Sequence, residues 1–131
     1  MSHRILQPDG WARPHGYANG IAAEGRQVFV SGQIGWDAAQ RIVSDEFAAQ
    51  ARQALANIAA VLATAGAKPE HLVRLTWFVT SRDEYNAALR EIGAAYRELI
   101  GRHYPAMSVV VVAGLLEPRA KVEIEATAVI F

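Results

Sequence analysis

The sequence predicts an α+β fold in which one mixed β-sheet is covered on one face by two α-helices. Two long segments repeat apolar residues at steps of three and four, which is typical of amphipathic helices. Shorter segments before, between and after them alternate or run apolar, as strands do. The expected order is therefore β-β-α-β-α-β-β. The 131 residues contain no internal repeat and no low-complexity tract, so we expect a single domain over residues 1–131.

The first two expected strands follow an N-terminal arm. Residues 1–20 are rich in glycine, proline and aromatic side chains, which indicates an ordered arm rather than a flexible linker. Two short strands should come next, on either side of a turn at Glu24 and Gly25. The second of these covers residues 27–31.

The first helix is expected over residues 44–66. Ser44 is a good N-cap, and Asp45 and Glu46 would occupy the first turn, where the helix dipole favours acidic side chains. Gly66 should end the helix. One face is apolar and should be buried: Phe47, Ala51, Leu55, Ile58 and Leu62.

A central strand and a second helix follow. Residues 71–80 alternate, and one side of this strand carries Val73, Leu75, Trp77 and Val79. Residues 81–101 form the second helix, which begins with a capping box of Ser81 and Glu84 and ends at Gly101. The apolar face of this helix consists of Tyr85, Leu89, Ile92, Tyr96 and Ile100.

The last two strands, in residues 106–116 and 120–131, carry information about assembly. In the stretch VVVVAGLL both sides of the strand are apolar, so both sides should be buried. Two helices can cover only one face of a sheet, and the chain has no further element for the other. A partner subunit is the natural cover, and we expect a homo-oligomer.

Composition excludes several classes of function. Thirteen basic and thirteen acidic residues cancel, and without a basic face we expect no nucleic-acid partner. Cysteine is absent, no apolar run approaches the ~20 residues that span a bilayer, and the N-terminus lacks the apolar core of a signal peptide. We therefore expect a cytoplasmic protein without a membrane partner. The four histidines have no metal-ligand spacing, so we expect no metal: His3, His15, His71 and His103.

Three groups of residues are candidates for chemistry. Glu123 and Glu125 lie on one side of the last strand, roughly 7 Å apart at ~3.3 Å per residue, and could share acid–base work or simply form a solvated strand face. Ser31 and Gly32 follow an apolar strand and could bind a ligand, or merely end that strand in a glycine turn. His103, beside an arginine, could meet an anion.

Several motifs in series resemble the Rid family of reactive-intermediate deaminases, also called YjgF. They are GY (16–17), VFVSGQI (28–34), QARQALANIAAVLATAGA (50–67), YPA (104–106) and VEIEATA (122–128). The resemblance covers nearly the whole chain. It implies a chorismate-mutase-like fold and a homotrimer whose sheets form a central barrel, with small-molecule clefts between subunits. Deaminases of this family hydrolyse imines and enamines such as 2-aminoacrylate without a cofactor.

The resemblance also assigns roles by position. It implies that Glu123 activates water, and that Tyr17 and Ser31 line the substrate cleft. The arginine that grips the substrate carboxylate falls on Met107, whose thioether donates no hydrogen bond. A position that is cysteine in some relatives is Val109 here. The chain thus keeps the residue for water activation but not the carboxylate clamp.

The sequence therefore favours a Rid-like hydrolase of a small imine, enamine or related carbonyl compound that lacks the usual α-carboxylate contact. Glu123 would be the general base, and Arg102 or His103 could substitute for the missing arginine. The alternative is a trimeric module that binds a small ligand without turnover, and a ribonuclease or translation inhibitor has less support from the neutral charge. The expected substrate-binding residues are Tyr17, Ser31, Gly32, Trp36, Met107 and Val109.

Overall fold

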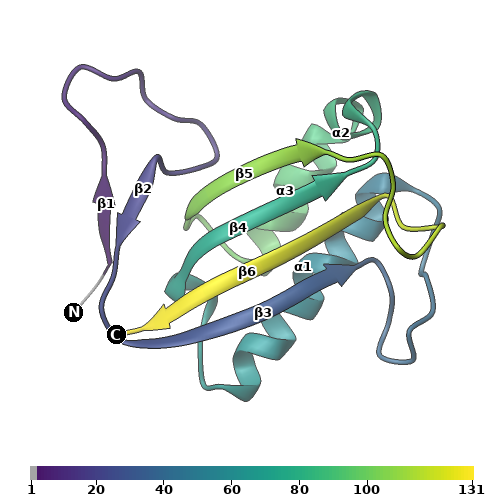
Figure 1. Ribbon diagram of the computed structural model, residues 1–131, viewed down its shortest axis with the longest axis horizontal. Coiled ribbons are helices and arrows are strands. Elements are labelled where there is room, and N and C mark those ends of the chain that lie inside the picture. Colours follow the sequence, from purple (N-terminus) through teal and green to yellow (C-terminus); the bar gives the residue numbers. More distant parts are fainter. Residues whose placement is uncertain (1–2) are drawn as a thin grey trace.

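A four-stranded mixed sheet forms the centre of the molecule. The computed structural model describes residues 3–131, and Figure 1 shows the sheet in front with the helices packed behind it. The strand order is β3-β6-β4-β5, with β4 and β5 parallel and the other pairs antiparallel. The strands are β3 (Arg26–Ile34), β4 (Leu72–Val79), β5 (Ala106–Val111) and β6 (Val122–Ile130). The predicted α+β sheet with helices on one face is confirmed.

Three helices and a short 3₁₀ turn complete the fold. They are α1 (Phe47–Thr64), η1 (Pro69–His71), α2 (Arg82–Ala87) and α3 (Leu89–Leu99). The predicted apolar face of α1 is buried against the sheet, with Leu55, Ile58 and Leu62 fully inaccessible to solvent. The alternate residues of β6 meet that face: Val122, Ile124, Ala126 and Ala128. No helix among residues 3–131 is long and apolar enough to cross a membrane.

The two predicted strands do flank the turn at Glu24 and Gly25, but they do not pair with each other. The strand β2 (Gly20–Ala22) pairs instead with β1 (Arg4–Leu6), so the N-terminal arm forms its own two-stranded sheet (Figure 1). Gly25 turns the chain with a φ of 145°, so close to the end of β6 that a Cβ there would collide with the Ile130 carbonyl. This contact with a distant strand is invisible in the local pattern.

The predicted cap of the first helix is also wrong. The helix begins at Phe47, and no acidic side chain lies in its first turn. Ser44 stays outside, where its hydroxyl accepts a hydrogen bond from the Glu46 N–H. Gln50 explains the difference, because its buried side chain donates to the Ser44 carbonyl at 2.8 Å and holds that residue away from a helical position.

The second predicted helix is divided and only partly buried. It breaks at Ala88 into α2 and α3. Ser81 caps α2 by accepting from the Glu84 N–H, but the Glu84 carboxylate bonds Lys121 rather than completing a capping box. Leu89 is 49% exposed, contrary to prediction, since the break rotates it off the buried face.

The central strand follows the expected alternation except at its start. Leu75, Trp77 and Val79 are buried, but Leu72 is buried in place of Val73. The pairing of β4 with β6 shifts between Leu72 and Arg74, and this irregularity moves the side chains by one position.

The sheet face opposite the helices has no cover within residues 3–131. Phe29 on this face is 71% exposed, and Val110, which pairs with Phe78 on the same face, is 40% exposed. Large contiguous apolar patches on a monomer surface mark interaction sites. The expectation that one chain leaves a sheet face uncovered is confirmed.

Candidate functional site

Glu123 lies on the open face of the sheet, directly over a glycine. On β6 it pairs with Ile34 of β3 and Phe78 of β4, and its side chain is half-buried. A Cβ at Gly32 would collide with the Glu123 carboxylate oxygen Oε2. The structure thus brings these two predicted residues into contact, and only a glycine leaves room for the carboxylate.

A bulge in β3 exposes the neighbouring hydroxyl. Pairing between β3 and β6 shifts between Val30 and Gln33, so Ser31 and Gly32 lie outside the regular ladder and are exposed. The Gln33 amide donates to the Ser31 carbonyl at 3.2 Å and to its hydroxyl oxygen at 3.4 Å. Ser31 can therefore still donate its hydroxyl proton to a ligand.

Ser31 also borders a cavity on the open face. This cavity, of about 460 Å³, is lined in addition by Phe29, Arg74, Glu125 and Thr127. Glu125 is exposed here, whereas Glu123 is half-buried over Gly32. The two predicted carboxylates share a face but have different surroundings, which suits different roles better than a shared one. The alternation of β4 could have indicated Arg74, which falls on its polar side.

Within one chain, Met107 and Val109 do not lie beside Glu123 and Gly32. They pair with Leu75 and Trp77 of β4, whose side chains are buried under the helices. Met107 packs against the hydrophobic core. One chain therefore places Met107 and Glu123 on opposite faces of the sheet.

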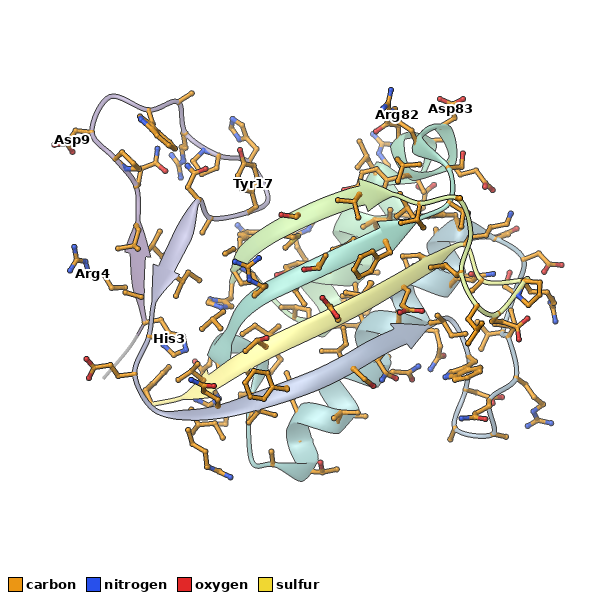
Figure 2. All side chains as sticks on the ribbon, viewed as in Figure 1. His3, Arg4, Asp9, Tyr17, Arg82 and Asp83 are labelled. Atoms are coloured by element: carbon orange, nitrogen blue, oxygen red, sulfur yellow. The ribbon has the colours of Figure 1, made fainter. Side chains whose placement is uncertain are left out.

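Tyr17 lies elsewhere, on the N-terminal arm (Figure 2). The arm is tied to the start of β5 by the Ala18 N–H, which donates to the Pro105 carbonyl at 3.0 Å. Tyr17 is 42% exposed and borders a second cavity, of about 440 Å³, together with Arg102 and His103. Glu123 does not line that cavity.

Trp36 lies in the loop that follows β3. It is half-buried and bridges to Ile42, and its carbonyl accepts a hydrogen bond from the Asn57 side chain of α1 at 2.9 Å. It lines neither cavity. These contacts hold the loop to the helix, so the residue shows a structural role here.

Arg102 and His103, the two residues predicted to replace an arginine at position 107, differ in availability. His103 Nε2–H donates to the Leu72 carbonyl at 2.6 Å, so the ring anchors its own loop. Arg102 is exposed and has no hydrogen-bond or ion-pair partner in the part of the chain that the structure describes. Arg102 is therefore the available cation of the two. No group of three or more His, Asp or Glu side chains within residues 3–131 could hold a metal ion.

Comparison with known proteins settles the family. Residues 11–130 match the family model described as Endoribonuclease L-PSP. The chain belongs to the Rid (YjgF, L-PSP) family. Among its relatives, the 2-iminobutanoate/2-iminopropanoate deaminase of Salmonella typhimurium is 35% identical, over 98% of each chain.

Solved Rid structures confirm the chorismate-mutase-like fold. A Rid-family protein of unknown function from Yersinia pestis superposes with a TM-score of 0.86 at 34% identity, covering 99% of this chain and 100% of that one. The YjgF gene product of Escherichia coli gives 0.67 at 35% identity, over 86% and 87% of the two chains.

Proposed function

We propose that this Rid protein is a hydrolase of a small imine, enamine or related carbonyl compound whose carboxylate, if present, is not held at position 107. The carrying observation is the half-buried Glu123 carboxylate packed over Gly32, beside the free hydroxyl of Ser31. The deaminase name of the Salmonella relative supports the reaction class.

Glu123 would act as the general base. It takes a proton from water while the water oxygen bonds to the imine carbon, and the C=N double bond becomes a C–N single bond. The same proton then passes to the nitrogen and gives a carbinolamine. Its hydroxyl proton is next transferred through the Glu123 carboxylate to the nitrogen while the C=O bond forms and the C–N bond breaks, so that ammonia leaves a carbonyl product. An enamine first tautomerises to the imine. Such catalysis typically contributes 10²–10⁴-fold, and it needs neither a metal nor a cofactor.

We propose that Tyr17, Met107 and Val109 contribute from a second chain. Ser31 and Gly32 would position the substrate beside Glu123, while Tyr17, Met107 and Val109 lie away from Glu123 in their own chain. We propose a homotrimer in which the uncovered sheet faces meet and the clefts form between subunits. The exposed Phe29 and Val110 support such an interface.

Replacing Glu123 by glutamine tests the reaction. Glu123→Gln keeps the shape but removes the base, so ammonia release from a panel of small imines and enamines should fall by about 10²-fold or more. Ligand binding should persist. Glu91→Gln, at an exposed position on α3, is the matched control and should leave both unchanged. Turnover by Glu123→Gln equal to that of the wild type would refute the proposed role.

A binding module without turnover is the second candidate. Met107 favours it, because a thioether packed against the core supplies no charged hydrogen bond to an amino-acid-derived imine. Specific ligand binding with no turnover of any panel member would support this candidate.

A further inference from the structure

The uncovered face of the sheet carries three charged side chains among neutral ones. The four strands contain four charged residues in all. One of them, Arg26, turns to the helix side, where it donates to the Ala65 carbonyl at the end of α1 at 3.0 Å. Arg74 on β4 and Glu123 and Glu125 on β6 remain on the face turned to the viewer in Figure 1. Any partner that covers this face has to accommodate these three charges.

Two of these charges, Arg74 and Glu125, have no partner in their own chain. Arg74 lies opposite Thr127, two positions along β6 from Glu125, so the two charged residues are diagonal neighbours. Both are exposed and line the cavity of about 460 Å³ on the open face. Neither side chain has a hydrogen bond or an ion pair among residues 3–131, although the chain does join exposed charges elsewhere, as in the Arg52–Glu98 pair at 2.7 Å. Arg74 and Glu125 are therefore available to groups outside the chain.

Glu123 is set apart from these two residues. Its carboxylate lies over Gly32, and it does not line the cavity that Arg74 and Glu125 share. On β6 it is opposite Phe78, which is four residues along β4 from Arg74, or roughly 13 Å at ~3.3 Å per residue. The open face thus presents one cation and one acid at the same cavity and keeps the proposed base away from both.

A second copy of the chain is the partner whose charges match. A charged side chain loses its hydration when a face is covered, which is unfavourable unless an opposite charge replaces the water. Each copy presents one Arg74 and one Glu125, so in a closed ring every arginine can meet the glutamate of the next subunit and none is left over. Phe29 lines the same cavity, is 71% exposed and supplies apolar area for the same contact.

We infer that Arg74 of one subunit forms an ion pair with Glu125 of the partner subunit, and that this pair fixes the register in which the copies meet. The inference rests on the proposed homotrimer and deepens it. Burial of an apolar side chain such as Phe29 is non-directional, whereas a guanidinium and a carboxylate bind through parallel hydrogen bonds of defined geometry. Register matters for the proposed hydrolysis, because the cleft has to bring Tyr17 of one subunit to Glu123 of another.

Charge reversal tests the contact. Arg74→Glu and Glu125→Arg each place like charges at the interface, so each should raise the concentration at which the particle dissociates by about 30-fold or more. Light scattering over a dilution series measures this concentration. Arg90→Glu, at an exposed position on α3, is the matched control and should assemble as the wild type does. All three positions are exposed, and circular dichroism should show the wild-type content of helix and strand in each variant.

Mixed particles distinguish a pair between chains from a pair within one chain. The two reversal variants would be co-expressed with different tags and purified through both. A chain with Arg74→Glu offers two acids and a chain with Glu125→Arg offers two arginines, so each complements the other but cannot pair within itself. In a ring of three, two of the three contacts regain opposite charges, and mixed trimers should persist at concentrations where either variant alone dissociates. Mixed particles no more stable than the variants alone would refute a pair across the interface.

The wild type separates failure of this pair from failure of the assembly. A wild-type protein that scatters light as a monomer would contradict the proposed homotrimer and the pair together. A trimeric wild type whose reversal variants dissociate at the wild-type concentration would overturn the pair alone and leave the homotrimer standing. The expected result is a trimeric wild type, dissociated reversal variants and recovery in the mixed particles.

Discussion

Glycine at position 32 has a role that its neighbours explain. The Glu123 carboxylate occupies the space where any other side chain would begin. The glycine therefore determines where the proposed base lies, and the bulge that contains it separates the base from the regular strand pairing. The sequence indicated both residues individually but could not indicate their contact.

Substitution of this glycine should affect catalysis through Glu123. Gly32→Ala would displace the carboxylate, and a misplaced general base should lower kcat by about 10-fold or more. Gly114→Ala is a suitable control, because a Cβ there meets nothing within 4 Å. Steady-state kinetics on the best substrate of the panel would measure both. If the Gly32→Ala variant retained the wild-type kcat, the position of Glu123 would not matter for turnover.

We propose that Met107 determines which substrates the protein accepts. Losing the charged partner of a bound carboxylate costs ~2–5 kcal/mol, which weakens affinity about 30-fold to several-thousand-fold. The wild type should therefore hydrolyse 2-aminoacrylate, generated in place by a dehydratase, poorly or not at all. Met107→Arg should raise the rate or the affinity, and Met107→Gln, which adds no charge, should not.

The position of Met107 limits that gain. Its side chain packs against the core, so an arginine there should also lower the melting temperature, at a cost of about 1–3 kcal/mol. Poorly supported contacts lose much of their strength. A wild-type protein that matched an arginine-bearing relative on 2-aminoacrylate would show that another cation, with Arg102 the first to test, holds the carboxylate.

At the scale of elements, the periodic sequence patterns predicted which side chains are buried in the core. They did not predict the features that depend on contacts between residues far apart in the sequence. The apolar face of α1 was predicted from a simple repeat, and it is buried as expected. The start of α1 depends on Gln50, which bonds Ser44 and the chain before β6. Likewise β1 pairs with β2 within the N-terminal arm. The cavity beside Tyr17 is lined by residues about ninety positions apart in the sequence, and no local pattern acts over that separation.

Gln50 should be one of the most sensitive positions for stability. It is fully buried, donates to the Ser44 and Arg119 carbonyls, and accepts from the Lys121 N–H. Gln50→Leu would leave these backbone groups unpaired and should lower the free energy of unfolding by about 2–5 kcal/mol. Denaturant titration measures this against Gln53→Leu, a half-buried position on the same helix, which should cost less. Equal stability of the two variants would show that the buried bonds contribute little.

For the whole molecule, one chain supplies only part of the proposed site. Glu123 lies on the open face, Met107 packs on the helix side of the sheet, and Tyr17 lies on the arm. A trimer that covers the exposed Phe29 would unite such separate residues, and light scattering should then give about three chains per particle.

Mixed oligomers test most directly whether the hydrolytic site forms between subunits. Glu123→Gln and Tyr17→Ala, each expected to lose most turnover alone, would be co-expressed with different tags and purified through both. In a closed ring of three, about one third of the sites would then combine an intact Glu123 with an intact Tyr17 from the neighbour. We expect turnover near one third of the wild-type value per site. Mixed particles no more active than the two variants alone would contradict a site shared between chains.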